Sequence, residues 1–230
     1  MITKDLRTFA ESTWQDYRES VTELSKSHGS GVSLVTSGQM LYNFDHICED
    51  QFIDGDVPTS ADALAVTTNS VELIEFKSGF RQKIRKDNLD PAKAICQHTH
   101  EICGSYWDLF FENQKRKLRE LISSVRLKAI ESYVTLEKCI FPLCRELHGA
   151  RYLRLKLIVV IDEDGVDAME DTLAELAGTQ VSSNCYADVR RALSRLRNKI
   201  DAAGNSYYYD DIEVMSSHDF QNYSLRYYKG

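Results

Sequence analysis

The chain has 230 residues, of which 43% are hydrophobic and 27% charged, an ordinary composition for a globular protein with a substantial core. No run approaches the ~18 to 20 apolar residues that cross a membrane, and the N-terminus lacks the apolar stretch of a secretory signal. The six cysteines lack the dense spacing of a disulfide scaffold, so we expect reduced thiols and a cytoplasmic protein.

The net charge of −7 argues against a protein that coats nucleic acid, but the charge is uneven along the chain. Residues 1–80 hold 5 Lys/Arg against 13 Asp/Glu, residues 81–160 hold 16 against 9, and residues 161–230 hold 7 against 13. The basic third begins with RQKIRK, which contains Arg81, Lys83, Arg85 and Lys86. This cluster predicts a phosphate-binding surface, and solvated helix faces explain it equally well.

Helical spacing of apolar residues predicts a first helix over residues 3–28, ended by the glycine-containing HGSG. Residues 31–36 predict a short strand or turn, and residues 38–52 predict a second helix. Asp45 and Glu49 lie four apart and share a face of that helix. For Asp45 we favour exposed surface, and for Glu49 we weigh exposed surface equally with a role in a site.

Residues 61–77 predict two strands joined by a polar turn. Glu75 and Lys77 project to one face of the second strand, and Phe76 is directed to the other. A simple antiparallel register brings Asp62 next to Glu75. Buried acids of this kind are costly unless paired or bound to a cation, and their oxygens suit Mg²⁺ or Mn²⁺. With a lysine alongside, the group predicts metal-assisted hydrolysis of a phosphodiester.

Asp62, followed thirteen residues later by Glu75-Phe76-Lys77 on an apolar strand, resembles the motif of the PD-(D/E)XK nuclease superfamily. The resemblance implies a restriction-endonuclease-like fold in which Asp62 and Glu75 bind the metal and the Phe76 carbonyl helps. It also implies that Lys77 is the catalytic lysine and that Glu49, on the preceding helix, assists. DNA is the substrate that the family favours, often in bacterial defence or repair.

The resemblance covers about residues 38–86. Ala61 stands directly before the aspartate, where the family motif has proline, and Pro58 lies four residues upstream of Asp62. The alternative interpretation of Glu75 and Lys77 is a solvent-edge strand whose charges prevent aggregation.

The segment CQHTHEIC offers the soft ligands Cys96, His98, His100 and Cys103, which suggest a zinc site. On a straight helix His98 lies off the stripe formed by the other three. Four ligands from one straight helix cannot surround a tetrahedral ion, so we favour an ordinary helical face with partly buried cysteines.

Residues 105–140 predict a long amphipathic helix whose basic side fits packing, phosphate contact or a protein partner. Residues 152–161, YLRLKLIVVI, predict a buried central strand, and residues 212–215 another strand. Helices are expected over 167–176 and 187–200. The second carries a further basic cluster, formed by Arg190, Arg191, Arg195, Arg197 and Lys199.

Together these patterns predict an α/β fold, with a central mixed β-sheet flanked by helices in one domain. Its parts are a helical segment (1–37), a catalytic core (38–165) and C-terminal helices with a strand (166–230). We expect a Mg²⁺- or Mn²⁺-dependent nuclease of nucleic acid, with target choice supplied by a protein partner, by a homodimer or by DNA structure. The alternative, favoured by the acidic pI of about 5.4, is a nuclease-like fold without catalysis that serves as an antitoxin, immunity or scaffold module.

Overall fold

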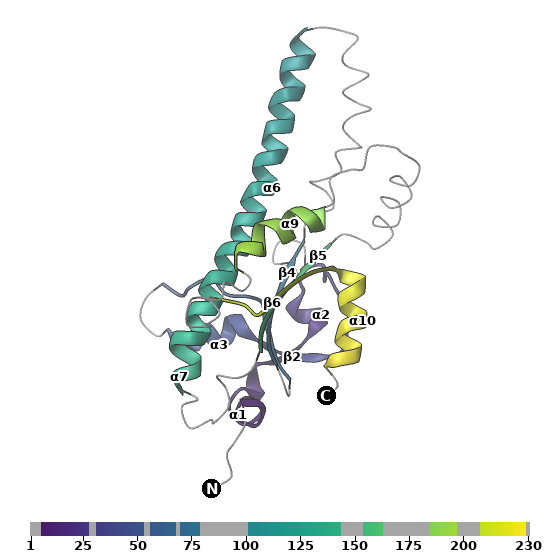
Figure 1. Ribbon diagram of the computed structural model, residues 1–230. Coiled ribbons are helices and arrows are strands. Elements are labelled where there is room, and N and C mark those ends of the chain that lie inside the picture. The colour runs from purple at the N-terminus through teal and green to yellow at the C-terminus, as the bar shows by residue number, and fades with distance from the viewer. Residues whose placement is uncertain are drawn as a thin grey trace.

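The computed structural model describes residues 6–27, 31–52, 56–67, 70–78, 101–143, 154–162, 185–196 and 208–228. Its centre is a six-stranded mixed sheet flanked by helices (Figure 1), which confirms the predicted α/β fold class. The strands lie in chain order: β1 Arg18–Ser20, β2 Met40–Asn43, β3 Ala63–Val66, β4 Ser70–Lys77, β5 Arg154–Ile161 and β6 Asp211–Ser216. Strands β1 to β4 pair antiparallel, whereas β4, β5 and β6 pair parallel.

The helices cover both faces of this sheet (Figure 1). They are α1 Leu6–Thr13, α2 Val21–Leu24, α3 Phe44–Gln51, α6 Glu101–Thr135, α7 Phe141–Leu143, α9 Cys185–Leu193 and α10 Ser217–Tyr227, with 3-10 turns at Gln15–Tyr17 and Ser194–Leu196 and a π-helical turn at Leu136–Ile140. The predicted helix over 167–176 lies outside the described residues. Within the described part of the chain, no helix is long and apolar enough to cross a membrane.

The helix predicted over 3–28 is wrong, because this segment divides into α1, a 3-10 turn, β1 and α2. Trp14 packs into the core on one face of the sheet, whereas Val21 and Leu24 pack into the core on the other. A continuous helix cannot reach both faces. The edge strand β1 makes the crossing, and the Ser20 hydroxyl then accepts the backbone N–H of Glu23 to begin α2.

The helix predicted over 38–52 is correct only in its second half, since residues 40–43 form β2. Leu41 and Tyr42 are buried on opposite faces of the sheet, which is the alternation of a strand. Helix α3 begins where the Asn43 side chain accepts the His46 backbone N–H at 3.0 Å. Four residues are too few for periodicity to separate a strand from a helix.

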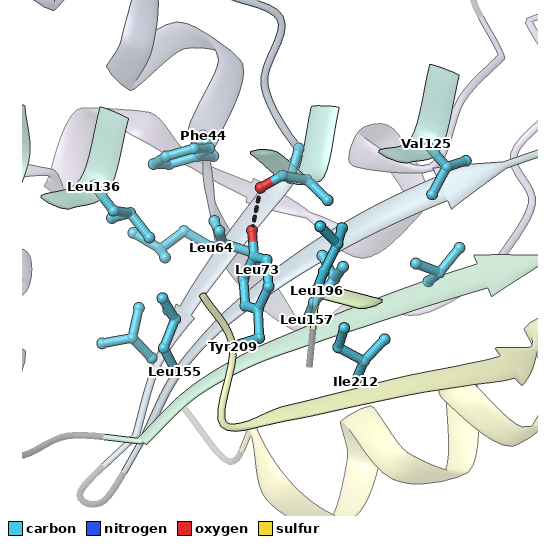
Figure 2. Packing of buried hydrophobic residues seen from close by; sticks show 14 of the residues in the cluster. Phe44, Leu64, Leu73, Val125, Leu136, Leu155, Leu157, Leu196, Tyr209 and Ile212 are labelled. Carbon is cyan, nitrogen blue, oxygen red and sulfur yellow. Dashed lines mark hydrogen bonds between the residues drawn. The ribbon is translucent and has the colours of Figure 1, made fainter. Parts of the chain in front are cut away.

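Strands β4 and β5 are buried on both faces, which explains the continuous apolar run at the end of β5, whereas β4 includes two buried acids, Glu72 and Glu75. On β5, Leu157 and Val159 face the core beneath α1, α3, α6 and α9, while Ile158 and Val160 face the core beneath α2 and α10. Figure 2 shows the first of these cores, where the Tyr209 hydroxyl donates to the Ala129 carbonyl of α6 at 2.6 Å. The two cores fix the sheet between α6 and α10.

The predicted central strand, long helix and final strand are confirmed as β5, α6 and β6. The helix expected over 187–200 is present as α9 and the 3-10 turn that follows it, up to residue 196. In Figure 1, α6 runs past the sheet and continues well beyond it. Its buried residues Val125 and Ala129 hold it against the sheet.

The C-terminal helix α10 is fastened to the sheet through Glu72 on β4, a buried carboxylate. Its oxygens accept hydrogen bonds from the hydroxyls of Ser70 (2.9 Å), Tyr223 (3.0 Å) and Tyr228 (2.6 Å). These tyrosines therefore pack against the sheet and donate hydrogen bonds to Glu72. Hydrogen-bond donors on both oxygens offset part of the cost of burying this carboxylate.

Tyr228→Phe removes one of the three hydroxyl donors to Glu72. We expect the free energy of unfolding to fall by about 1.5–3 kcal/mol, the usual contribution of a hydrogen bond to a charged group. Chemical denaturation measures the change. Tyr227→Phe is the matched control, because Tyr227 is 53% exposed, and equal stability of the two variants would contradict the role of Glu72.

Candidate active site

The β3–β4 hairpin has the register that the sequence predicts. Ala63 lies opposite Ile74, which places Asp62 beside Glu75 at the end of the pair. The Phe76 backbone N–H donates to Asp62 Oδ2 at 2.6 Å and fixes that carboxylate. The Phe76 ring points to the opposite face and packs edge-on against Phe220, as predicted. The two acids therefore meet at one end of an apolar hairpin.

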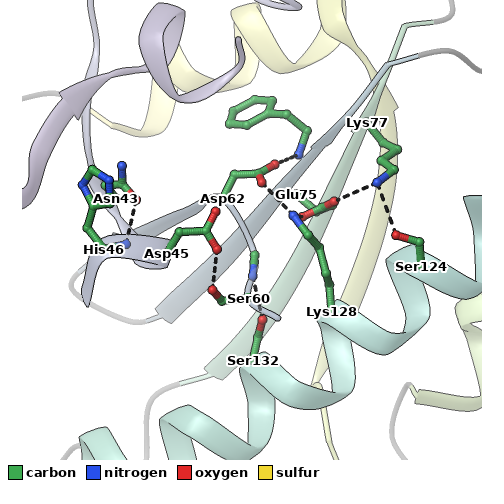
Figure 3. A network of polar contacts seen from close by, with 12 residues as sticks. Asn43, Asp45, His46, Ser60, Asp62, Glu75, Lys77, Ser124, Lys128 and Ser132 are labelled. Atoms are coloured by element: carbon green, nitrogen blue, oxygen red, sulfur yellow. Dashed lines mark hydrogen bonds and ion pairs between the residues drawn. The ribbon is translucent and has the colours of Figure 1, made fainter. Parts of the chain in front are cut away.

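A third charged group, which sequence reasoning missed, completes the cluster. Lys128 projects from α6 toward the two acids, and its Nζ lies 2.9 Å from Asp62 Oδ1 and 3.0 Å from Glu75 Oε2 (Figure 3). The available signal was a polar stripe at Ser124, Lys128 and Ser132, four residues apart. This stripe runs alongside the buried stripe of α6, whereas a solvated lysine would lie on the opposite face.

Further polar contacts hold α6 against the start of the hairpin. Ser132 Oγ accepts the Ala61 backbone N–H at 2.8 Å, and Glu131 Oε2 accepts both the N–H and the hydroxyl of Thr59 at 2.6 Å. Two successive turns of the helix, at Lys128 and at Glu131 and Ser132, therefore contact the hairpin and the segment before it through side chains. The position of Lys128 is fixed by its helix as well as by its own ion pairs.

Lys77 lies on the same face as Glu75, as predicted, but it is not part of the Lys128 ion pairs. Its Nζ lies 3.9 Å from Glu75 Oε1, beyond hydrogen-bond distance, and donates to Ser124 Oγ at 3.3 Å. The side chain borders the cleft described below. Lys77 is therefore an ammonium held beside the acids and open to a ligand.

Glu75 is the most constrained group in the site, because its residue is only 1% exposed. Burial, and then the negative charge of Asp62, raise the pKa of Glu75 to about 8. Burial alone would lower the pKa of Lys128, but the charges of Glu75 and Asp62 raise it above its ordinary value. Glu75 Oε1 is buried without a hydrogen-bond partner among the described residues. An unsatisfied buried oxygen of this kind is typical of a functional site.

These groups line a cleft of about 800 Å³. Asp45, for which the sequence favoured exposed surface, is half-buried at this cleft, and its carboxylate accepts a hydrogen bond from the Ser60 hydroxyl. Burial raises the pKa of Asp45. Glu49 lines the same cleft but is exposed, so Asp45 is the more enclosed acid of α3.

The cleft is acidic within the described residues. Its carboxylates are Glu19, Glu23, Asp45, Glu49, Asp62 and Glu75, and its lysines are Lys26, Lys77 and Lys128. A polyanion meets repulsion in such a cleft unless further cations enter with it. The site therefore favours positive ligands at its base.

The described residues contain no group of three or more His, Cys, Asp and Glu side chains placed to hold a metal. Asp62 and Glu75 offer two carboxylates, which is the number that Mg²⁺ usually takes from a protein while keeping several waters. The orphaned Oε1 of Glu75 adds an available ligand atom. The donor set therefore fits Mg²⁺ or Mn²⁺.

Several predicted groups lie outside the described residues, namely Arg81, Lys83, Arg85 and Lys86 of the basic cluster and Cys96, His98 and His100 of the zinc hypothesis. Cys103 lies in the first turn of α6. Of the second basic cluster, Arg190 and Arg191 are exposed on α9.

Replacing Glu75 by Gln tests whether the pKa of Glu75 is raised in the folded state. The wild-type folded state keeps the Glu75 proton up to about pH 8, whereas the unfolded chain releases it near 4.5, so this group stabilises less as pH rises through that window. Glu75→Gln should therefore melt several degrees above wild type at pH 8–9 and not near pH 5, since 1 kcal/mol shifts Tm by about 2–4 °C in a chain of this size. Glu49→Gln, at an exposed acid, is the control. Parallel pH curves for wild type and Glu75→Gln would contradict the raised pKa.

Comparisons with known proteins do not assign the chain to a family. No family model, no curated protein and no solved structure matches the chain. The function must therefore be argued from the arrangement of Asp62, Glu75, Lys77 and Lys128.

Proposed function

We propose that the chain is a metal-dependent nuclease that hydrolyses phosphodiester bonds, with DNA as the favoured substrate. The observation that carries this proposal is the buried Glu75 carboxylate, whose Oε1 has no hydrogen-bond partner in the described structure. Asp62 lies directly beside it and two lysines converge on it. The resemblance of these residues to the PD-(D/E)XK motif supports the same chemistry.

Asp62 and Glu75 are the residues that would hold Mg²⁺ or Mn²⁺, with the Phe76 carbonyl as the further ligand that the resemblance implies. When bound, such an ion supplies polarisation of the scissile phosphate and a more acidic water. The hydrogen bond from the Phe76 N–H fixes the Asp62 carboxylate and leaves its Oδ1 directed toward Glu75 and Lys128. This preorganisation is what a metal site requires of its ligands.

Lys77 is the residue best placed to contact the reacting phosphate. Its ammonium borders the cleft, donates a hydrogen bond to Ser124 and makes only a long ion pair, 3.9 Å, with Glu75 Oε1. From that position it can orient the attacking water and stabilise negative charge that develops on phosphate oxygens. Asp45, half-buried on α3, and Glu49, exposed on the same helix, supply further negative charge to the cleft.

One observation favours a second candidate function, a nuclease-like fold without catalysis that serves as a protein-interaction module. Lys128 already places a positive charge against both Asp62 and Glu75. A buried acid pair compensated by its own lysine is compatible with a purely structural role. The two functions differ in whether a divalent cation binds.

Cleavage of plasmid, linear and single-stranded DNA and of RNA tests the proposed nuclease. We expect cleavage with Mg²⁺ or Mn²⁺, none with EDTA, and a loss of about 10²–10³-fold in Lys77→Met, the usual effect of removing one electrostatic donor. Lys138→Met, at an exposed lysine that does not line the cleft, is the charge-matched control. Full activity in Lys77→Met, or no cleavage of any substrate, would contradict the proposal.

Thermal denaturation with Mn²⁺ separates the two candidate functions. A cation that binds only the folded state at 100 times its Kd stabilises by about 2.7 kcal/mol, so the wild-type Tm should rise with Mn²⁺ concentration. Asp62→Asn should lose this response because it removes a charged ligand. A wild-type Tm that does not change with Mn²⁺ concentration would favour the interaction module.

A further inference from the structure

The Lys128 ammonium lies where a cation shared by the two acids would bind. It is almost equidistant from one oxygen of each carboxylate, at 2.9 Å from Asp62 Oδ1 and 3.0 Å from Glu75 Oε2 (Figure 3). An ammonium in this position satisfies the acids with one positive charge. The site therefore contains its own cation.

Glu75 keeps one oxygen, Oε1, without a hydrogen-bond partner in the described residues, but a metal shared by the two acids also needs an oxygen of Asp62, where the choice is narrow. Asp62 Oδ2 is bonded to the Phe76 backbone N–H at 2.6 Å, which is a contact of the hairpin itself. Asp62 Oδ1 is therefore the oxygen that can be given to a metal, and Lys128 holds it. Mg²⁺ approaches its oxygens to about 2.0–2.1 Å. A metal at Oδ1 would thus lie within a few ångströms of the ammonium, where two positive charges repel strongly in a buried site.

We infer that Lys128 and a divalent metal exclude each other from the position between Asp62 and Glu75, so that metal binding expels the Lys128 ammonium from between the two acids. The inference rests on the proposed function and names a regulation of that same site. Lys128 is an internal competitor that lowers metal affinity until the metal concentration or a substrate overcomes it.

The movement involves the side chain and leaves α6 in place. Ser132 and Glu131 bond Ala61 and Thr59 one turn further along the helix, and these bonds do not involve Lys128. The lysine stem is flexible, and its residue lines the cleft. A displaced ammonium therefore moves into the cleft, where the phosphates of a polyanionic substrate would be its next partner.

Lys77 provides a control of equal charge within the same cleft. It lies 3.9 Å from Glu75 Oε1, and its hydrogen bond goes to Ser124. Removing Lys77 changes the field at the acids but vacates neither Asp62 Oδ1 nor Glu75 Oε2. The effect of occupancy can thus be separated from the effect of charge.

The first experiment is Mn²⁺ titration calorimetry of wild type, Lys128→Met, Lys77→Met and Asp62→Asn. We expect Lys128→Met to bind Mn²⁺ about tenfold or more tightly than wild type, since even one charge-assisted hydrogen bond corresponds to that factor. Lys77→Met should show a clearly smaller gain, and Asp62→Asn should lose binding.

Equal Mn²⁺ affinity of wild type and Lys128→Met would overturn the competition and leave the proposed metal site intact. An equal gain in Lys77→Met would also overturn it, because net charge alone would then explain the result. Absence of Mn²⁺ binding in every variant would overturn the metal site, and the inference with it.

The second experiment needs no variant and holds even if Lys128→Met folds poorly. Wild type is treated with an amine-acetylating reagent with and without Mn²⁺, and each lysine is followed by peptide mass spectrometry. Expulsion predicts several-fold faster acetylation of Lys128 in Mn²⁺, while exposed Lys138 stays constant. Unchanged or slower acetylation of Lys128, at Mn²⁺ concentrations shown by calorimetry to saturate the site, would overturn the inference.

Discussion

The rest of the structure depends on one electrostatic constraint, the burial of the Glu75 carboxylate within a sheet. Strand β4 is flanked by β3 and β5, and α6 covers the face on which Glu75 lies. An isolated buried charge would be very costly, so this carboxyl must either keep its proton or have a cation beside it when it ionises. Lys128 supplies that cation from α6, and the contacts of Ser132 and Glu131 with the segment before β3 keep that helix in register.

Strand β4 carries two buried acids whose surroundings differ. Glu72 faces α10 and has hydroxyl donors on both of its oxygens. Glu75 faces α6 and keeps one oxygen without a hydrogen-bond partner in the described residues. Evolution of a stable core alone favours the first arrangement. The second is typical of sites at which a ligand completes the coordination.

Local sequence patterns predicted much of this fold. The strand β5, the helix α6 and the register that joins Asp62 to Glu75 follow from periodicity and from one short turn. Sequence patterns did not predict that residues 6–24 divide into two helices and a strand. The segment divides because its apolar residues pack into two cores on opposite faces of the sheet. Lys128 was missed for a similar reason: it lies 53 residues from Glu75, and local spacing does not encode such a contact. Tertiary packing decided both cases.

Two sets of contacts fix the rotation of α6 about its own axis. The Tyr209 hydroxyl donates a hydrogen bond to the Ala129 carbonyl, and side chains of α6 contact the hairpin. One inserted residue rotates an α-helix by about 100°, which would bring an apolar residue to the acids in place of Lys128. Seven inserted residues nearly restore the phase. During divergence, the part of α6 over the sheet should therefore tolerate length changes close to whole pairs of turns.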